Sequence, residues 1–399
     1  MKARTIKALC RPQLKAHTGK ADAMPVYSKT LFAIAIMLLL AVAGLWWLAL
    51  LILVMYGFSR WLKSRVFVKK YALAGVLCLI LSVGTLAILV RVFVLEVYVV
   101  PSGSMEDEIF TGDDILVSKL NYGPKLPQSP FEIPWVNLWF YHHKESVNPD
   151  SIYWPYKRLG GFSDIKHNDV IVFKKLNSDK KFLVKRCMGL PGETVRINDS
   201  NVFINNHKVN LPRTVKQHYR APLKNNMVFK RIADRLNIKY DINPGSNSDV
   251  ADCYLNMQEV MLLKNANCID SLIYQKLTYT AYPQQAEINW SLDNFGPITV
   301  PARGVSLPLT KMNYMLYKAV LADEGADLKQ KGSVFYVNGK PAINYVFKYN
   351  YYFVLGDNRP ESVDSRFWGF VPENAIEGRV ICSIFAKSKT GKFIMAKLL

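Results

Sequence analysis

The apolar residues of the chain are concentrated before residue 101. No charged residue occurs from Leu31 to Phe58, a run of 28 residues, or from Tyr71 to Val90, a run of 20. A helix needs about 20 apolar residues to cross the hydrocarbon core of a bilayer. Both runs therefore predict transmembrane helices, which we place at 30–58 and 71–97. The alternatives are a buried core helix and a cleaved signal peptide; the length of the first run and the second span after it disfavour the latter.

After residue 100 the pattern changes to short runs rich in β-branched and aromatic residues, separated by turn residues. Five of these runs predict strands: 114–120, 169–175, 181–190, 193–197 and 201–205. Many short strands with this spacing are typical of an antiparallel β domain. We therefore expect a mainly β fold that follows two membrane helices.

The region between residues 211 and 333 differs from its surroundings. Two similar stretches flank it, "VFINNHKVN" (202–210) and "VFYVNGKPAIN" (334–344), and the Asn-Gly pair of the second is a strong hairpin signal. We expect two hairpins of like design, with a large α/β insertion between them whose role the sequence does not reveal. Within the insertion, 226–238 predicts a helix, whereas 271–282 fits either a strand or a helix.

Positive charge is concentrated near the N-terminal end of the chain. The formal net charge is +20, and residues 1–70 hold twelve Lys or Arg against one acid, Asp22. This excess suits an anionic membrane surface, and the β region has no motif that would indicate a nucleic-acid partner. Five positive charges in the loop 59–70 place it in the cytoplasm by the positive-inside rule, which puts the β domain outside. The tail 1–29 has seven more, a conflict that a translation start at Met24 would remove.

The cysteines and histidines do not indicate a metal site. Cys253 and Cys268 are close in sequence and could form a disulfide, although spacing alone does not set the geometry. No CxxC pair, zinc spacing, HExxH, P-loop or GxGxxG motif occurs. The pair His142-His143 is more typical of a solvated loop. We expect neither a metal nor a cofactor.

Three polar stretches carry the candidate chemistry: "PSGSM" (101–105), "LVKRCMGLPGE" (183–193) and "GDNRPESVDSRFWGFVP" (356–372). The second places Lys185 in a predicted strand of mostly apolar residues. Burial of a charged amine is costly, and desolvation lowers the pKa of a lysine. Lys185 could therefore serve as a general base near neutral pH.

Each stretch also has a simpler interpretation. The first could be a loop after a membrane helix, Lys185 could reach water from an edge strand, and the third could be a structural knot of ion pairs. Side-chain alternation would place Leu183, Lys185 and Cys187 on one face of the strand and Arg186 on the other.

Taken together and in this order, the three stretches resemble the sequence boxes of bacterial type I signal peptidases, a family of serine proteases with a Ser–Lys dyad. The matching positions are Pro101, Ser102, Ser104, Met105, Lys185, Arg186, Gly189, Pro191, Gly192, Glu193, Gly356–Arg359, Ser362, Asp364–Arg366, Trp368 and Gly369. The resemblance covers about residues 70–210 and 334–382. It departs from the family pattern at "EDEIF" (106–110), which lacks the usual Pro-Thr, at Pro360-Glu361, and in the insertion.

The resemblance implies a role for each matching polar residue. Ser104 would be the nucleophile and Lys185 its general base, with Ser362 orienting the lysine. The oxyanion hole would consist of the Ser102 hydroxyl and the backbone N–H of Ser104. Asp364 would form a structural ion pair with Arg366.

The resemblance also implies a substrate and a location. The substrates would be signal peptides of exported preproteins, cut at the outer face of the bacterial cytoplasmic membrane, where the enzyme contacts lipid. Five apolar residues around the dyad are expected to line the pockets for small substrate side chains, with ordinary strand packing as the alternative: Val99, Val100, Met105, Ile109 and Val184.

The expected organisation and its alternatives follow from these points. From the N-terminus we expect a basic tail (1–29), a first span (30–58), a cytoplasmic loop (59–70), a second span (71–97), a catalytic β domain (98–210 and 334–399) and an inserted subdomain (211–333). A self-cleaving repressor relative is disfavoured because that group lacks membrane spans. A catalytically silent membrane scaffold remains the alternative from a different class.

Overall fold

The computed structural model describes residues 72–133, 153–174, 182–244, 249–387 and 393–398, together with Leu53 and Gly57. The chain divides into two compact units, Met1–Val66 and Phe67–Leu399, and the helices and strands described here belong to the second. Apart from Leu53 and Gly57, the predicted tail, first span, basic loop and His142-His143 pair lie outside the described residues.

The first described element is a helix that is shorter than the predicted second span. Helix α4 covers Ala72–Phe93, and strand β1 already begins at Leu95. The helix does not continue to residue 97 because β1 pairs antiparallel with β2 (Asp114–Ser118), and Glu96 in β1 forms an ion pair with Lys119 at 2.8 Å. Among the described residues, no helix has both the length and the apolar character required to span a membrane.

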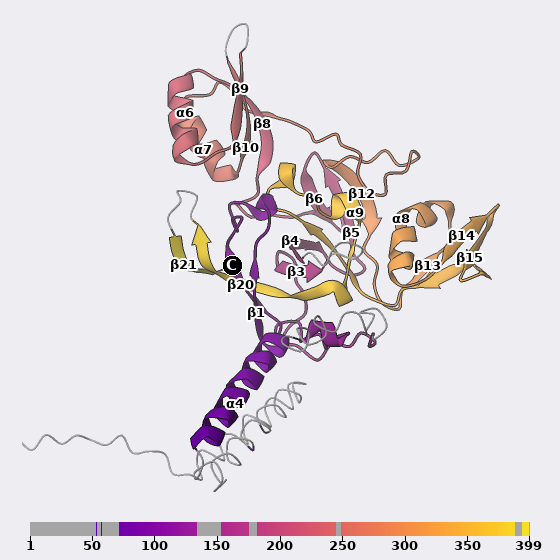
Figure 1. Ribbon diagram of the computed structural model, residues 1–399. Coiled ribbons are helices and arrows are strands. Elements are labelled where there is room, and N and C mark those ends of the chain that lie inside the picture. Colours follow the sequence, from indigo (N-terminus) through magenta and orange to yellow (C-terminus); the bar gives the residue numbers. More distant parts are fainter. Residues whose placement is uncertain are drawn as a thin grey trace, which may run out of the picture. The chain divides into compact units, whose positions relative to one another are not determined.

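An antiparallel sheet forms the centre of the second unit (Figure 1), with strand order β1-β2-β20-β3-β4-β18-β19 and β21 paired to β20. Its remaining strands are β3 (Val170–Lys174), β4 (Phe182–Gly189), β18 (Tyr351–Leu355), β19 (Val371–Pro372), β20 (Ile376–Lys387) and β21 (Phe393–Leu398). The strands predicted at 114–120, 169–175 and 181–190 are thus confirmed.

Both faces of the sheet are buried. In β3, Val170 and Val172 belong to one apolar cluster, whereas Ile171 and Phe173 belong to another. Successive side chains of a strand point to opposite faces, so apolar residues cover the sheet on each side. A polar side chain in the middle of such a strand is therefore removed from water.

A second sheet corrects the predicted domain boundary. It has the order β12-β5-β6-β7, with β5 (Thr194–Asn198), β6 (Asn201–Ile204), β7 (His207–Lys208) and β12 (Asn294–Thr299). Strand β12 comes from the predicted insertion, as does helix α8 (Lys311–Asp323). Both contribute to one apolar core with the catalytic region, because Phe295 and Tyr317 share a cluster with Phe353 of β18. Residues 211–333 are therefore not a single separate subdomain.

The two hairpins predicted to resemble each other are present. Strands β6 and β7 are joined by Asn205-Asn206, and β15 (Val334–Val337) and β16 (Lys340–Ala342) by Asn338-Gly339. All four turn residues have positive φ, the conformation that favours Asn and Gly in two-residue hairpin loops. Strand β14 (Leu328–Lys331) pairs with β15, and β13 (Ser306–Pro308) pairs with β17 (Asn344–Val346).

Residues 217–274 form a small unit with its own core. Its sheet has the order β11-β8-β10-β9, and Figure 1 shows α6 and α7 beside it. The elements are β8 (Gln217–Pro222), α6 (Asn226–Arg235), β9 (Tyr240–Asn243), β10 (Val250–Leu255), α7 (Met257–Asn265) and β11 (Ile273–Tyr274). The predicted helix at 226–238 is confirmed as α6, and part of 271–282 is the short strand β11. Cys253 and Cys268 both lie in the core of this unit as free thiols, so the disulfide is not formed.

Candidate active site

Ser104 and Lys185 lie together in the interior. Ser104 is in the short 3-10 helix η1 (Gly103–Met105), just after β1, and Lys185 is in the middle of β4. The Lys185 Nζ is 2.6 Å from the Ser104 Oγ. Their exposed fractions are only 2% and 6%. The two side chains are separated by 81 residues of sequence, yet they are in direct hydrogen-bond contact.

The environment of Lys185 lowers the pKa of its amine to about 8. Burial is the main cause, because it disfavours the charged form. The carboxylates of Asp364 and Asp357 act in the opposite direction but do not cancel the effect. The second hydrogen-bond partner of Nζ is the Val184 carbonyl, at 3.0 Å. A neutral amine is thus available close to physiological pH, at hydrogen-bond distance from a hydroxyl.

The turn that carries Ser104 is held by the stretch that begins at Gly356. The backbone N–H of Asn358 donates to the Ser104 carbonyl at 3.0 Å, and its side-chain amide donates to the Gly103 carbonyl at 3.1 Å. Gly356 lies so close that an added Cβ would be 2.2 Å from the Ser362 Oγ and 2.6 Å from the Ser104 carbonyl oxygen. Only a residue without a side chain fits at this position.

Behind this stretch lies a fully buried ion pair. Asp364, with no exposed surface, accepts hydrogen bonds from the Arg366 Nε at 2.9 Å and from a second guanidinium nitrogen at 3.0 Å. Burial alone would raise the pKa of the Asp364 carboxyl, but the Arg366 charge outweighs it and the pKa is lowered. The same carboxylate accepts from the Gly356 N–H at 3.1 Å. The ion pair therefore fixes the backbone that contacts the Ser104 turn.

Comparison with known proteins identifies the family of this chain. The family model described as signal peptidase, peptidase S26, matches residues 73–252 and 342–385, which is more than half of the chain. The chain belongs to the signal peptidase family, peptidase S26. It is accordingly a serine endopeptidase.

Curated relatives cover most of the chain. Signal peptidase I of Buchnera aphidicola subsp. Baizongia pistaciae is 26% identical over 320 residues, which are 80% of this chain and 79% of that protein. Signal peptidase I of Aquifex aeolicus is 24% identical over 290 residues, 73% of this chain and 75% of that protein. The solved structure of a signal peptidase I from Enterococcus faecalis covers 54% of this chain and 97% of that one, with 20% identity and a TM-score of 0.22.

The other two serines expected in the peptidase site have different environments. Ser362 is buried, and its Oγ makes no hydrogen bond with any described residue, Lys185 included. This hydroxyl is nevertheless near enough to Asp364 to help lower the pKa of that carboxyl. Ser102 is exposed at the start of η1, with an extended backbone and no capping hydrogen bond from its side chain.

The expected pocket residues divide into two groups. Val100, Met105, Ile109 and Val184 belong to the apolar cluster on one side of the sheet. Val99 is 66% exposed. Val99 alone of these five is open to solvent, and the other four are buried in that cluster.

Sequence reasoning missed the partner of Arg186. Its guanidinium binds the Asp357 carboxylate in a bidentate fashion, at 2.8 and 2.5 Å, and donates to the Asn168 carbonyl at 2.9 Å. Alternation along β4 indicated that Arg186 points away from Lys185, but no pattern identified an acid 171 residues away as its partner. The pair links the lysine strand to the stretch after Gly356.

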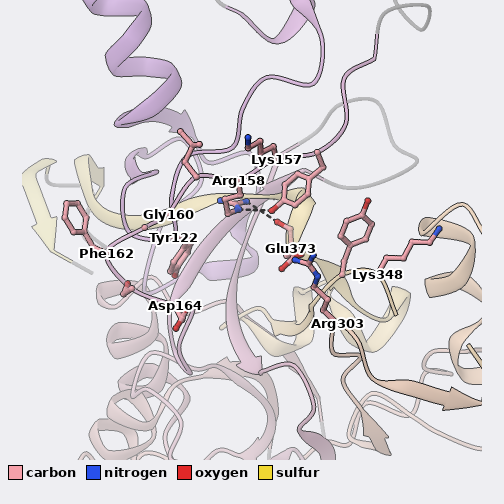
Figure 2. Close-up of a pocket in the computed structure, with 14 residues that line it drawn as sticks. Tyr122, Lys157, Arg158, Gly160, Phe162, Asp164, Arg303, Lys348 and Glu373 are labelled. Atoms are coloured by element: carbon pink, nitrogen blue, oxygen red, sulfur yellow. Dashed lines mark hydrogen bonds between the residues drawn. The ribbon is translucent and has the colours of Figure 1, made fainter. Parts of the chain in front are cut away.

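A cavity of about 660 Å³ lies elsewhere, and neither Ser104 nor Lys185 lines it (Figure 2). Arg158 at its wall donates to the carbonyl oxygens of Gly123, at 2.8 Å, and Glu373, at 3.1 Å. These bonds tie the segment around Arg158 to the stretch before β20. The cavity therefore has no part in the arrangement of Ser104 and Lys185.

Proposed function

We propose that Ser104 and Lys185 are the catalytic dyad with which this peptidase cleaves signal peptides from exported preproteins. The observation that carries the proposal is the 2.6 Å contact between Oγ and an amine whose pKa is lowered to about 8. A serine hydroxyl is a weak nucleophile until a base accepts its proton. Neutral Lys185 is positioned to accept it.

The reaction then follows in two halves. As Lys185 takes the proton, the Ser104 Oγ attacks the scissile carbonyl, and the protonated amine later gives the proton to the leaving amine nitrogen. Water, deprotonated by the same lysine, hydrolyses the acyl-enzyme and regenerates the serine. Because Lys185 is buried, its positive charge is destabilised, which favours return of the proton at each step.

The negative charge that develops on the carbonyl oxygen needs donors. The Ser104 N–H and the Ser102 hydroxyl are assigned this role, since Ser102 lies two residues before the nucleophile and its hydroxyl has no capping bond to break. Loss of one such donor typically costs about 3 kcal/mol of barrier. We therefore expect Ser102→Ala to reduce kcat by about 100-fold.

Ser362 is proposed to orient Lys185 during the reaction, and the ion pair of Asp364 with Arg366 to hold Ser362. Support comes from the position of the Ser362 hydroxyl close to Gly356, which itself approaches the Ser104 carbonyl. Of the expected pocket residues, Val99 is the one that a substrate can reach, and the other four would shape the floor below it.

We further propose that the enzyme is anchored in the bacterial cytoplasmic membrane, with the β domain on the outer side. Support comes from the two uncharged runs Leu31–Phe58 and Tyr71–Val90, the basic loop 59–70, and exposed apolar side chains of α4 such as Leu81. Ser104 follows the end of α4 by eleven residues, which suits cleavage close to the membrane surface. A silent scaffold is the alternative, but it gives no reason for a buried amine beside a serine.

The decisive experiment is cleavage of a preprotein by the full chain in detergent. Ser104→Ala and Lys185→Ala should each abolish cleavage while thermal unfolding remains cooperative, whereas Lys230→Ala, at an exposed position on α6, should be fully active. Cleavage by either dyad variant at the wild-type rate would exclude the mechanism. A topology reporter fused after residue 399 should report the outer side, and a cytoplasmic signal would exclude the proposed orientation.

A further inference from the structure

A second lysine near the site is almost completely buried. Lys216 lies just before β8, with an exposed fraction of 1%. Its Nζ is 3.4 Å from a carboxylate oxygen of Glu106 and 3.4 Å from one of Asp107. These two acids directly follow the turn that carries Ser104. A charge removed from water to this degree is costly unless it is paired.

The backbone of Lys216 is tied to the other half of the site. Its N–H donates to the Asp357 carbonyl at 2.9 Å, and its own carbonyl accepts from the Arg359 N–H at 3.3 Å. Lys216 and Asn358 thus form a parallel bridge. Asn358 in turn donates to the Ser104 carbonyl. Lys216 therefore contacts, with its side chain, the acids that directly follow the Ser104 turn and, with its backbone, the stretch that supports that turn.

Neighbouring side chains also contact the acidic residues that follow the Ser104 turn. The Thr214 hydroxyl lies 3.0 Å from the Glu108 carboxylate and 3.3 Å from that of Asp357. From the other side, the side-chain amide of Asn256 donates to the Asp107 carboxylate at 2.6 Å. The residues that surround the acidic segment 106–108 thus come largely from the chain between β7 and α7.

The backbone of the acidic segment also requires support. Asp107 has φ of +75°, in the left-handed region that is uncommon for residues other than glycine. Charge supplies this support, because three consecutive carboxylates face the buried cations Lys216 and Arg186.

We propose that Lys216 is a positioning residue for the cleavage reaction: by neutralising Glu106 and Asp107 it fixes the turn that holds Ser104 against Lys185, and it makes the unit 217–274 part of the support of the active site. The proposal rests on the proposed function. It assigns a role to the insertion that the sequence alone left without one.

The test compares two lysines of the same region in the detergent-solubilised full chain. Lys216→Met should reduce kcat at least tenfold, since a displacement of 1 Å can cost about 100-fold, while KM changes less than about threefold because the exposed Val99 is untouched. The matched control is Lys239→Met. Lys239 also pairs with an acid of the supporting stretch, Glu361 at 2.5 Å, but its side chain is 63% exposed, and kcat should stay within twofold because exposed ion pairs contribute little.

A third variant separates positioning from a general loss of structure. If the defect arises from two carboxylates left without a cation, Glu106→Gln with Asp107→Asn in the Lys216→Met background should restore at least tenfold of the lost kcat. Asn is also tolerated at positive φ. A general weakening of the fold would lower the midpoint of thermal unfolding and would not be rescued.

The outcomes distinguish this inference from the proposed function. Wild-type kcat in Lys216→Met overturns the inference, and so does a defect that the neutralising pair fails to rescue. If Ser104→Ala itself still cleaves the preprotein, the proposed function fails first. Inactive Ser104→Ala together with fully active Lys216→Met leaves the dyad intact and removes only the role of Lys216.

Discussion

Replacing Lys185 with methionine should abolish cleavage and, at neutral pH, make the folded protein more stable. Methionine has a similar length and no charge, and the site is almost completely buried. In the wild type, burial lowers the pKa of the amine from 10.5 to about 8. The folded state therefore bears the cost of a buried ammonium group wherever Lys185 is protonated.

The size of this effect follows from the pKa. A difference between 10.5 and about 8 corresponds to about 3 kcal/mol of unfolding free energy. Between these two pH values the unfolded chain binds a proton that the folded chain does not, so wild-type stability rises with pH across this window. The cost is fully present below pH 8 and vanishes above pH 10.5. Methionine also loses the contacts of Nζ with Ser104 and Val184, each of which contributes about 1 kcal/mol.

The difference in stability between Lys185→Met and the wild type should therefore change sign between pH 7 and pH 10.5. At pH 7, Lys185→Met should be more stable than wild type by about 1–2 kcal/mol, because the removed charge cost exceeds the two lost hydrogen bonds. At pH 10.5 only the lost hydrogen bonds remain, and the variant should be the less stable protein. Thermal or urea unfolding of the full chain in detergent at pH 7, 8, 9 and 10.5 measures the difference. Lys230→Met, at an exposed position, is the control and should show no such trend.

Two results would refute this reasoning. A Lys185→Met variant that is less stable than wild type at pH 7 would mean that the amine is not desolvated at a cost. A stability difference that is equal at pH 7 and pH 10.5 would mean that Lys185 does not titrate between these values in the folded protein.

Three further outcomes are expected. The kcat/KM of the wild type should rise about 90-fold from pH 6 to pH 9 and level off, as the neutral fraction of a base with a pKa of about 8 does; a rate that still rises tenfold per unit at pH 9 would place the pKa of Lys185 near its ordinary value. Gly356→Ala should reduce kcat by at least 100-fold, because its Cβ would meet the Ser362 Oγ at 2.2 Å and the Ser104 carbonyl at 2.6 Å; unchanged kcat in a folded variant would contradict this. Asp364→Asn should lower the unfolding free energy by about 3–5 kcal/mol, because it leaves a buried guanidinium without its carboxylate. Denaturant unfolding measures this loss, and a loss of less than about 1 kcal/mol would contradict the expectation.

Local pattern was sufficient to predict three strands of the central sheet, β2, β3 and β4, and the two hairpins. Alternating and β-branched runs identified β2, β3 and β4, because the apolar side chains that bury each strand belong to that strand's own sequence. The Asn-Gly pair at 338–339 identified its turn through a conformational preference of two residues. These features depend on residues that are close in sequence, so the sequence alone predicts them.

The end of α4 and the extent of the insertion depend on distant partners. Leu95 and Val97 are apolar and could continue a helix, but pairing with β2 and the Glu96–Lys119 contact place residues 95–97 in a strand. Strand β12 looked like part of a separate subdomain, yet it pairs with β5 across about a hundred residues of chain. No local signal reports such pairings.

The residues of the candidate site also divide into those that local sequence identified and those that only the fold brings together. Ser104 and Lys185 could be named in advance because they stand in recognisable stretches, and apolar neighbours indicated burial of the lysine. Lys216 could not, because its flanking sequence is ordinary and its importance arises only from the two acids that the fold brings within 3.4 Å of it. Charge pairs between remote segments carry no local sequence pattern.

The position of β20 has a consequence for the timing of activity during synthesis. Strand β20 lies between β2 and β3, and so joins the strand that follows the nucleophile turn to the strand next to that of Lys185. Its residues are translated almost 200 positions after Lys185. A ribosome-bound chain that has already exposed both dyad residues therefore still lacks the strand that brings their halves together, so the nascent enzyme should be unable to cut the secretory proteins emerging beside it.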